Sequence, residues 1–232
     1  MTALALIPGL NNTRHLWHDL VARMPASIRC HPVDCSPLPT LEGIAADLLA
    51  ELPDTFFLCG FSFGGWVALA MLEQAPQRIL GLALVCSSDS RDGERQLAAR
   101  EKSIVKASGG GYEDMIRAQA PHLFHPDNLH DHDMIRQRED MVPLYGADRF
   151  IAHTRAAIAR PDRSEMLRDA RVPLLIVAAD DDRIISKQSQ AEMASRLPQA
   201  GFRSIAGAGH MLPLERPGPL ADELGRWIGS VI

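Results

Sequence analysis

Long hydrophobic runs are absent from this sequence of 232 residues. A helix that spans a bilayer needs about 20 consecutive apolar residues, and no segment comes near that length. The apolar stretch at residues 1–12 has no basic segment before it and soon meets Pro8-Gly9. It is therefore predicted to contain a core strand and not a signal peptide. We expect no membrane among the partners of this protein.

Positive charge is also in short supply. The chain has 24 Lys and Arg against 29 Asp and Glu, a formal net charge of -5, and the two signs are mixed along the sequence. Nucleic acid is not expected as a partner, because phosphate binding needs a concentrated basic surface. The balance still allows an anionic substrate, which needs only one local positive group.

Cysteine pairs and nucleotide-binding loops are missing as well. The four cysteines form no C-x-x-C pair, and Cys59 and Cys86 lie in apolar runs, where cysteine behaves as a small buried hydrophobe. Nothing in their placement requires an oxidising compartment, so a cytoplasmic protein is expected. No G-x-G-x-x-G or P-loop motif occurs, and no nucleotide cofactor is expected. The remaining cysteines are Cys30 and Cys35.

Metal-ligand motifs have little support. His122, His125, His130 and His132 lie close together in the sequence. No cysteine or settled ligand spacing accompanies them, so a polar surface is favoured over a metal site. We expect neither a metal nor any other cofactor.

Short apolar runs alternate with longer segments of helical period, which is typical of a mostly parallel sheet with helices on both faces. We predict an α/β fold with strands apolar on both faces, and Thr40 as the N-cap of the second helix. The strands are expected at residues 3–7, 28–33, 55–59, 79–86, 173–178 and 201–205, and the helices at 17–24, 41–52, 63–73, 188–196 and 219–228.

One stretch interrupts this alternation. Residues 87–171 have helical patterning and no convincing strand, and most loops in compact domains have only about 4–6 residues. The sequence therefore predicts a core formed by residues 1–87 and 172–232, with a helical insertion at 88–171. The run Gly109-Gly110-Gly111 is expected to join two helices of the insertion, as a plain turn in preference to a moving hinge.

The segment Gly60-Phe61-Ser62-Phe63-Gly64 matches G-x-S-x-G, a pattern that is only suggestive by itself. Here it follows an apolar run and opens a segment of helical pattern. So tight a strand-to-helix turn strains Ser62 and requires glycine on both sides. It would present the hydroxyl of Ser62 at the positive end of the helix dipole. The alternative, a glycine-rich helix start with a capping serine, accounts for less of this context.

A serine nucleophile needs a base, and the base needs an orienting carboxylate. Asp180, Asp181 and Asp182 follow the fifth predicted strand, and His210 stands in a glycine-rich loop after the sixth. All these residues lie just past strand ends, where open α/β sheets form their ligand crevice. The sequence therefore predicts that Ser62, an aspartate and His210 meet in one site.

With these motifs the chain resembles the α/β-hydrolase family over nearly its whole length. The resemblance implies that the insertion is the family's helical lid. It also implies that the family's first two strands are lacking, which leaves a sheet of about six. The motifs that carry it are Pro8-Gly9-Leu10, the G-x-S-x-G segment, Asp180-Asp181-Asp182-Arg183-Ile184-Ile185, Gly209-His210-Met211 and Leu214-Glu215-Arg216-Pro217.

The resemblance also implies roles for single residues. In the family a small residue and two variable positions precede the orienting aspartate, and counting from Ala179 favours Asp182 over Asp181. The oxyanion hole is implied at the backbone N–H groups of Phe63 and Leu10. Many relatives have histidine where this chain has Pro8. The N–H donor can keep its geometry, but the hydrogen bonds of that histidine to the loop are lost.

Together these features predict an enzyme that hydrolyses a carboxylic ester of a small molecule through an acyl-enzyme. A serine nucleophile argues against haloalkane dehalogenation, which uses an aspartate in this family. Members of the family that cleave carbon–carbon bonds often have tryptophan directly after the histidine. This chain has Met211 there, which makes carbon–carbon bond cleavage less favoured. Thioesterase and lactonase activity use the same triad and stay open, as does a non-catalytic ligand receptor on the same fold. The sequence does not indicate an oligomeric state.

Overall fold

The computed structural model describes residues 1–232 and contains one six-stranded sheet. The strand order is β2-β1-β3-β4-β5-β6, and every neighbouring pair is parallel. This confirms the predicted fold class. The strands are β1 (Thr2–Ile7), β2 (Ile28–Pro32), β3 (Phe56–Phe61), β4 (Ile79–Val85), β5 (Leu174–Ala179) and β6 (Ala200–Ile205).

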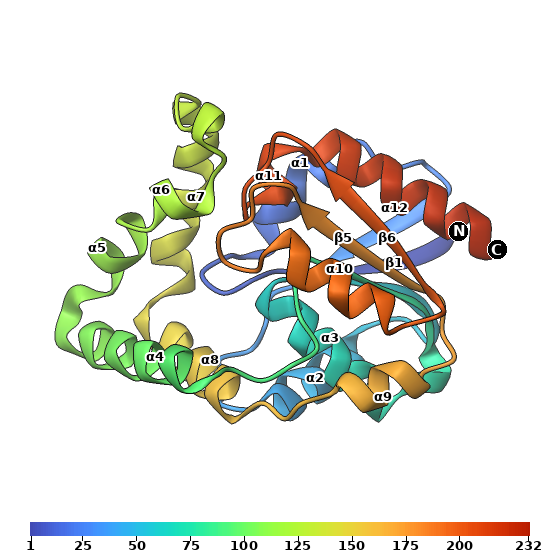
Figure 1. Cartoon of the computed structure of the whole chain (residues 1–232), viewed down its shortest axis with the longest axis horizontal. Coiled ribbons are helices and arrows are strands. Elements are labelled where there is room, and N and C mark those ends of the chain that lie inside the picture. The colour runs from blue at the N-terminus through green and yellow to red at the C-terminus, as the bar shows by residue number, and fades with distance from the viewer.

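Helices cover both faces of the sheet (Figure 1). One face packs against α2 (Leu41–Glu51), α3 (Phe63–Gln74) and α10 (Lys187–Ser195). The other face packs against α1 (His18–Val21) and α12 (Pro217–Val231). The smaller helical pieces of the core are η1 (Arg14–Trp17), η2 (Pro76–Arg78) and α11 (Leu212–Glu215).

Strand β3 shows how the sequence produces these layers. Successive side chains of a strand point to opposite faces. Phe56 and Leu58 pack into the hydrophobic cluster under α2 and α3. Phe57 and Cys59 pack into the cluster that includes residues of α1 and α12. A strand covered on both faces is apolar at every position, and for this reason its apolar run could be identified in the sequence.

The two edge strands differ from the expectation that every strand is apolar on both faces. Arg29 in β2 and both Arg203 and Ser204 in β6 are exposed. The expectation is wrong for these strands because each has a neighbour on one side only and the helices cover it less completely. The four inner strands are apolar and buried almost throughout.

The predicted helices of the core are largely found. Thr40 caps α2, since its hydroxyl accepts a hydrogen bond from the N–H of Gly43 (3.2 Å). The first predicted helix is divided into η1 and α1, and α11 was not predicted. None of the helices combines the length and the apolar character needed to cross a bilayer.

Between β4 and β5 the chain forms a series of helices joined by short connections, with no strand. The run Gly109-Gly110-Gly111 joins two of the helices, as predicted, and Gly110 has φ +85°. Helices α4 to α7 stand to one side of the sheet, in green and yellow (Figure 1). The elements are α4 (Glu94–Lys106), η3 (Ala107–Gly111), α5 (Tyr112–Arg117), α6 (Ala120–Leu123), η4 (Pro126–Asn128), α7 (His132–Tyr145), α8 (Ala147–Ala159) and α9 (Ser164–Asp169).

Candidate active site

Ser62 occupies the turn between β3 and α3. Its backbone has φ 51° and ψ -117°, in the left-handed region that non-glycine residues rarely adopt. Two hydrogen bonds hold it there. Its N–H donates to the carbonyl of Val85 at the end of β4 (2.9 Å), and its carbonyl accepts from the hydroxyl of Ser87 (2.8 Å). The strained turn is therefore supported by the neighbouring strand.

The glycines on either side of Ser62 are required by close backbone contacts. A Cβ on Gly60 would lie 2.4 Å from the carbonyl oxygen of Gly64, and a Cβ on Gly64 would lie 2.3 Å from that of Ile7. Neither backbone neighbour can move away cheaply. These contacts give the physical reason for the G-x-S-x-G pattern at this turn.

The side chains of Ser62, His210 and Asp182 form a continuous hydrogen-bonded series. Nε2 of His210 lies 3.0 Å from Oγ of Ser62. Nδ1 of the same ring lies 2.9 and 3.0 Å from the two carboxylate oxygens of Asp182. Both His210 and Asp182 are buried. The structure thus brings together three residues that are far apart in the sequence.

Asp182 is held in its ionised form. Burial by itself would raise its pKa, but the neighbouring His210 and the N–H groups of Ile185 (2.9 Å) and Ile184 (2.8 Å) outweigh this and lower the pKa of the carboxyl below its usual value. An ionised carboxylate can only accept hydrogen bonds. Nδ1 of His210 therefore donates to Asp182, and Nε2 is the ring nitrogen that faces Oγ of Ser62.

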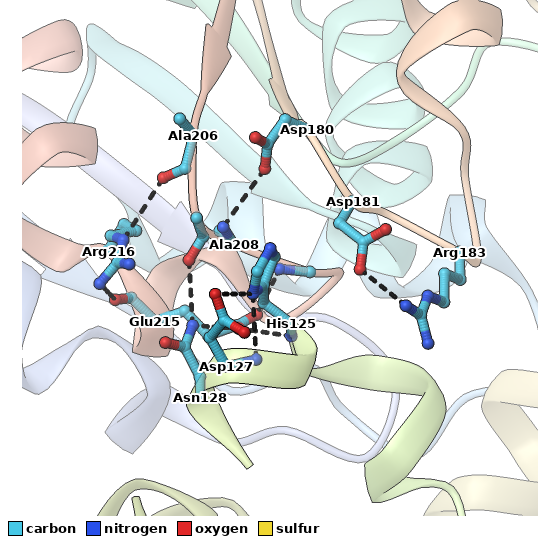
Figure 2. A network of polar contacts seen from close by, with 12 residues as sticks. His125, Asp127, Asn128, Asp180, Asp181, Arg183, Ala206, Ala208, Glu215 and Arg216 are labelled. Atoms are coloured by element: carbon cyan, nitrogen blue, oxygen red, sulfur yellow. Dashed lines mark hydrogen bonds and ion pairs between the residues drawn. The ribbon is translucent and has the colours of Figure 1, made fainter. Parts of the chain in front are cut away.

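The two neighbouring aspartates have other partners. Asp181 forms an ion pair with Arg183 (3.0 Å), and Asp180 accepts a hydrogen bond from the N–H of Ala208 (3.4 Å) (Figure 2). Of the three acidic residues after β5, Asp182 is the one that contacts His210.

The two predicted oxyanion donors lie beside Ser62. Leu10 and Phe63 line the same cavity as Ser62 and His210. The N–H of Leu10 makes no hydrogen bond within the protein. Phe63 is the first residue of α3, and the first N–H groups of a helix have no partner within it. Neither N–H group therefore has an acceptor within the protein.

Asn12 stabilises the loop after β1, where Pro8 replaces the histidine of many relatives. Its side-chain amide donates to the carbonyl of Leu10 (2.8 Å), and its N–H donates to the carbonyl of Gly9 (3.2 Å). A Cβ on Gly9 would lie 3.3 Å from Cβ of Ser62, so the loop closely approaches the nucleophile turn. Asn12 supplies hydrogen bonds that Pro8 cannot make, and the sequence pattern did not indicate this role.

The cavity beside Ser62 has a volume of about 840 Å³. Core residues such as Phe61 and Met211 form part of its wall. The rest comes from the insertion, with Gln119, His122 and Arg138 among the lining residues. The site therefore lies between the sheet and the inserted helices.

Comparison with known proteins identifies the fold family. The sequence model of the Alpha/beta hydrolase family matches residues 4–223. The chain belongs to the α/β-hydrolase family. It is 26% identical over 232 residues to a pimeloyl-[acyl-carrier protein] methyl ester esterase of Aromatoleum aromaticum, covering 92% of this chain and 93% of the relative. It is 25% identical over 177 residues to a putative carbamate hydrolase, RutD, of Azorhizobium caulinodans. This match covers 75% of this chain and 66% of the relative.

Solved structures share the whole architecture of this α/β-hydrolase. A thermophilic esterase from Thermogutta terrifontis with malate bound superposes with a TM-score of 0.94 at 22% identity, covering 100% of this chain and 90% of that one. The enol-lactonase from Burkholderia xenovorans has a TM-score of 0.89 at 19% identity, covering 98% of this chain and 90% of the lactonase chain. At such identities the likeness establishes the fold. The family and the relatives' named activities make this chain a hydrolase.

Glu215 connects the histidine loop of the α/β-hydrolase to its insertion. Its carboxylate is buried and accepts hydrogen bonds from the N–H of Gly209 (2.8 Å), the N–H of His125 (2.7 Å) and the side-chain amide of Asn128 (2.7 Å) (Figure 2). Burial raises the pKa of Glu215, against the effect of these donors. In the sequence analysis Glu215 appeared only as part of the Leu-Glu-Arg-Pro tail, and no role was predicted for its carboxylate.

One group of three potential metal-ligand side chains occurs, formed by Cys86, Asp182 and His210. Asp182 and His210 are already bonded to each other. Burial raises the pKa of the Cys86 thiol well above its ordinary value, so the sulfur stays protonated, whereas metal binding requires the thiolate. This donor set does not suit a metal ion.

Proposed function

We propose that this α/β-hydrolase cleaves carboxylic esters of small molecules through an acyl-enzyme on Ser62. The observation that carries the proposal is the series of hydrogen bonds from Ser62 through His210 to Asp182, with distances of 3.0 and 2.9 Å. A serine hydroxyl becomes an effective nucleophile when such a base removes its proton. The cavity beside Ser62 has room for the substrate.

In the first half of the reaction Ser62 attacks the ester carbonyl while Nε2 of His210 takes the hydroxyl proton. The N–H groups of Leu10 and Phe63 stabilise the oxyanion that forms, and losing one such donor can reduce turnover by about 10²–10³-fold. His210 then passes the proton to the leaving alcohol. Asp182 remains ionised, orients the ring and stabilises the imidazolium.

In the second half, water repeats the attack on the acyl-enzyme. His210 takes a proton from water, and the hydroxide equivalent adds to the acyl carbonyl. When the tetrahedral intermediate collapses, the proton returns to the oxygen of Ser62 and the acid is released. The same residues therefore serve both steps in the same roles.

The helical insertion at residues 88–171 is proposed to act as the lid of this site. The support is its share of the cavity wall, which includes Gln119, His122 and Arg138. Because these side chains line the cavity beside Ser62, they would determine which esters are accepted. The core would supply the chemistry and the insertion the selectivity.

The test is hydrolysis of 4-nitrophenyl esters from acetate to decanoate by the wild type and by Ser62→Ala. Activity should disappear in the variant, and a fluorophosphonate probe should label only the wild type. The matched control is Ser230→Ala, at an exposed serine of α12, which should behave as the wild type.

Three other outcomes of this assay would change the proposal. Equal activity in Ser62→Ala would contradict the assignment of the nucleophile. If the wild type hydrolyses no ester, thioesters and lactones follow in the same assay. Tight binding of a small molecule without turnover would instead support a receptor on this fold.

A further inference from the structure

Arg138, in helix α7 of the insertion, is a buried cation without a partner. It is 2% exposed, its side chain makes no hydrogen bond or ion pair in the protein, and its buried Nη1 has no acceptor. Burial lowers the pKa of Arg138 to about 10, which leaves the guanidinium charged at neutral pH. Arginine is almost never fully buried unless it is paired, because an unpaired charge loses its hydration without compensation.

The groups near Arg138 that could have paired with it are used elsewhere. Glu139 forms an ion pair with Arg117 (3.7 Å). The hydroxyl of Tyr112 donates to the side-chain oxygen of Asn11 (3.2 Å). The cost of burying Arg138 is therefore not offset inside the protein, which points to a partner that arrives from outside.

Arg138 lines the cavity that also contains Ser62 and His210. Asp92 is the one carboxylate of the cavity wall, and it is bound by Arg160 (2.7 Å) and Arg100 (2.5 Å). The lining therefore has an excess of positive charge, and such a cavity concentrates anions. The arginines that line the cavity are Arg95, Arg100, Arg138, Arg160 and Arg183.

We propose that Arg138 binds a carboxylate carried by the ester substrate, so that this hydrolase selects esters with a free carboxylate over neutral esters of the same size. The inference rests on the proposed function of Ser62 and adds the substrate class. A guanidinium matches a carboxylate with two parallel N–H···O bonds. Apolar residues of the wall, including Phe61 and Met211, would contact the chain between the carboxylate and the scissile ester.

The experiment compares kcat/KM for matched pairs of esters. On the acyl side, 4-nitrophenyl monoesters of adipate, pimelate and suberate are compared with neutral 4-nitrophenyl esters of equal carbon number. On the alcohol side, 4-acetoxybenzoate is compared with its methyl ester. The wild type should prefer the anionic member of at least one pair by about 10- to 100-fold, the range expected for hydrogen bonds to a charged group.

Substitutions at Arg138 should change this preference. In Arg138→Met the ratio of the two kcat/KM values should fall to near one, and Arg138→Lys should keep part of it because the charge remains. Arg136→Met, at an exposed position of the same helix, should keep the wild-type ratio. No preference in any pair, or a full preference retained by Arg138→Met, would overturn the proposal.

The melting temperature distinguishes a role of Arg138 in substrate recognition from a role in stabilising the fold. Replacing an unpaired buried charge by an apolar side chain of similar length should leave the melting temperature unchanged or raise it. A lower melting temperature of Arg138→Met with an unchanged anionic-to-neutral ratio would assign Arg138 to the architecture and overturn the proposal.

The design also distinguishes this inference from the proposed function. Neutral esters hydrolysed by the wild type and not by Ser62→Ala support the nucleophile, whatever the result at Arg138. If no ester is hydrolysed, adipate is titrated calorimetrically into Ser62→Ala and into Ser62→Ala/Arg138→Met. Binding by the first protein alone supports the carboxylate site, and no binding by either one contradicts it.

Discussion

The carboxylate of Glu215 accepts a hydrogen bond of 2.8 Å from the N–H of Gly209, the residue immediately before His210. The same side chain accepts from His125 and Asn128 in the insertion. A buried carboxylate thus fixes the loop that carries the proposed base and joins it to the inserted helices (Figure 2). The position of His210 depends on a residue that does not touch the reacting atoms.

Removing this carboxylate should impair both folding and turnover. Glu215→Ala leaves three donors without their acceptor, and each unsatisfied buried group costs about 1–3 kcal/mol. We expect the free energy of unfolding to drop by about 2–4 kcal/mol, since water can satisfy some donors. We also expect kcat for esters to fall more than KM rises, and Glu215→Gln to recover part of both. Urea unfolding and steady-state kinetics measure these effects.

The matched control for Glu215 is Glu165→Ala, at an exposed position of α9. It should leave stability and turnover as in the wild type. If Glu215→Ala kept the stability and the kcat of the wild type, the loop that carries His210 would not depend on Glu215 for its position.

The fold could be predicted because the inner strands are apolar on both faces and the nucleophile turn has a local pattern. Gly60 and Gly64 are required by contacts close to Ser62, and the pattern records those contacts. The edge strands were less predictable, since β6 exposes Arg203 and Ser204 as a surface segment would.

Other parts of the site depend on contacts that no local pattern contains. Glu215 and the N–H of His125 are 90 residues apart in the sequence, and nothing near either one marks the bond. Arg138 resembles any helical arginine until the fold buries it without an ion-pair partner. Asp182 could be favoured over Asp181 only through the family resemblance, because spacing alone left both available.

Exchanging the two aspartates for asparagine should distinguish them. Asp182→Asn removes the ionised acceptor that sets the tautomer of His210, and loss of such a carboxylate in a triad lowers turnover by about 10⁴-fold. Asp181→Asn breaks an ion pair with Arg183 that is partly exposed, and turnover should stay within about threefold of the wild type, as for surface pairs. Comparable losses in both variants would place the orienting role elsewhere.

The nucleophile turn should not accept a methyl group. In Gly64→Ala the new Cβ would meet the carbonyl oxygen of Ile7 at 2.3 Å. We expect a loss of about 1–3 kcal/mol in the free energy of unfolding, as for overpacking, and a large loss of kcat. Thermal unfolding and ester hydrolysis measure both. Gly229→Ala is the control, because a Cβ at that position of α12 meets nothing within 4 Å, and helix propensity should raise its stability by about 0.5–1 kcal/mol.

His153 should make the protein less stable in mild acid. Its buried ring stacks on Phe63 with centroids 4.8 Å apart, donates from Nε2 to the carbonyl of Ser36 (2.7 Å) and accepts from the hydroxyl of Tyr145. Burial lowers the pKa of His153 from 6.5 to about 4. The unfolded chain therefore binds this proton first as the pH falls. The stability that His153 contributes is complete above pH 6.5 and is lost as the pH falls to about 4, in total about 3 kcal/mol.

The measurement is the free energy of unfolding between pH 7 and 4 for the wild type, His153→Gln and His130→Gln. His153→Gln should be less stable than the wild type at pH 7, because glutamine does not replace the stacked ring, and the difference should shrink as the pH falls. His130→Gln, at an exposed histidine, should follow the wild type throughout. Parallel curves for the wild type and His153→Gln would show that His153 is protonated equally in the folded and unfolded chains.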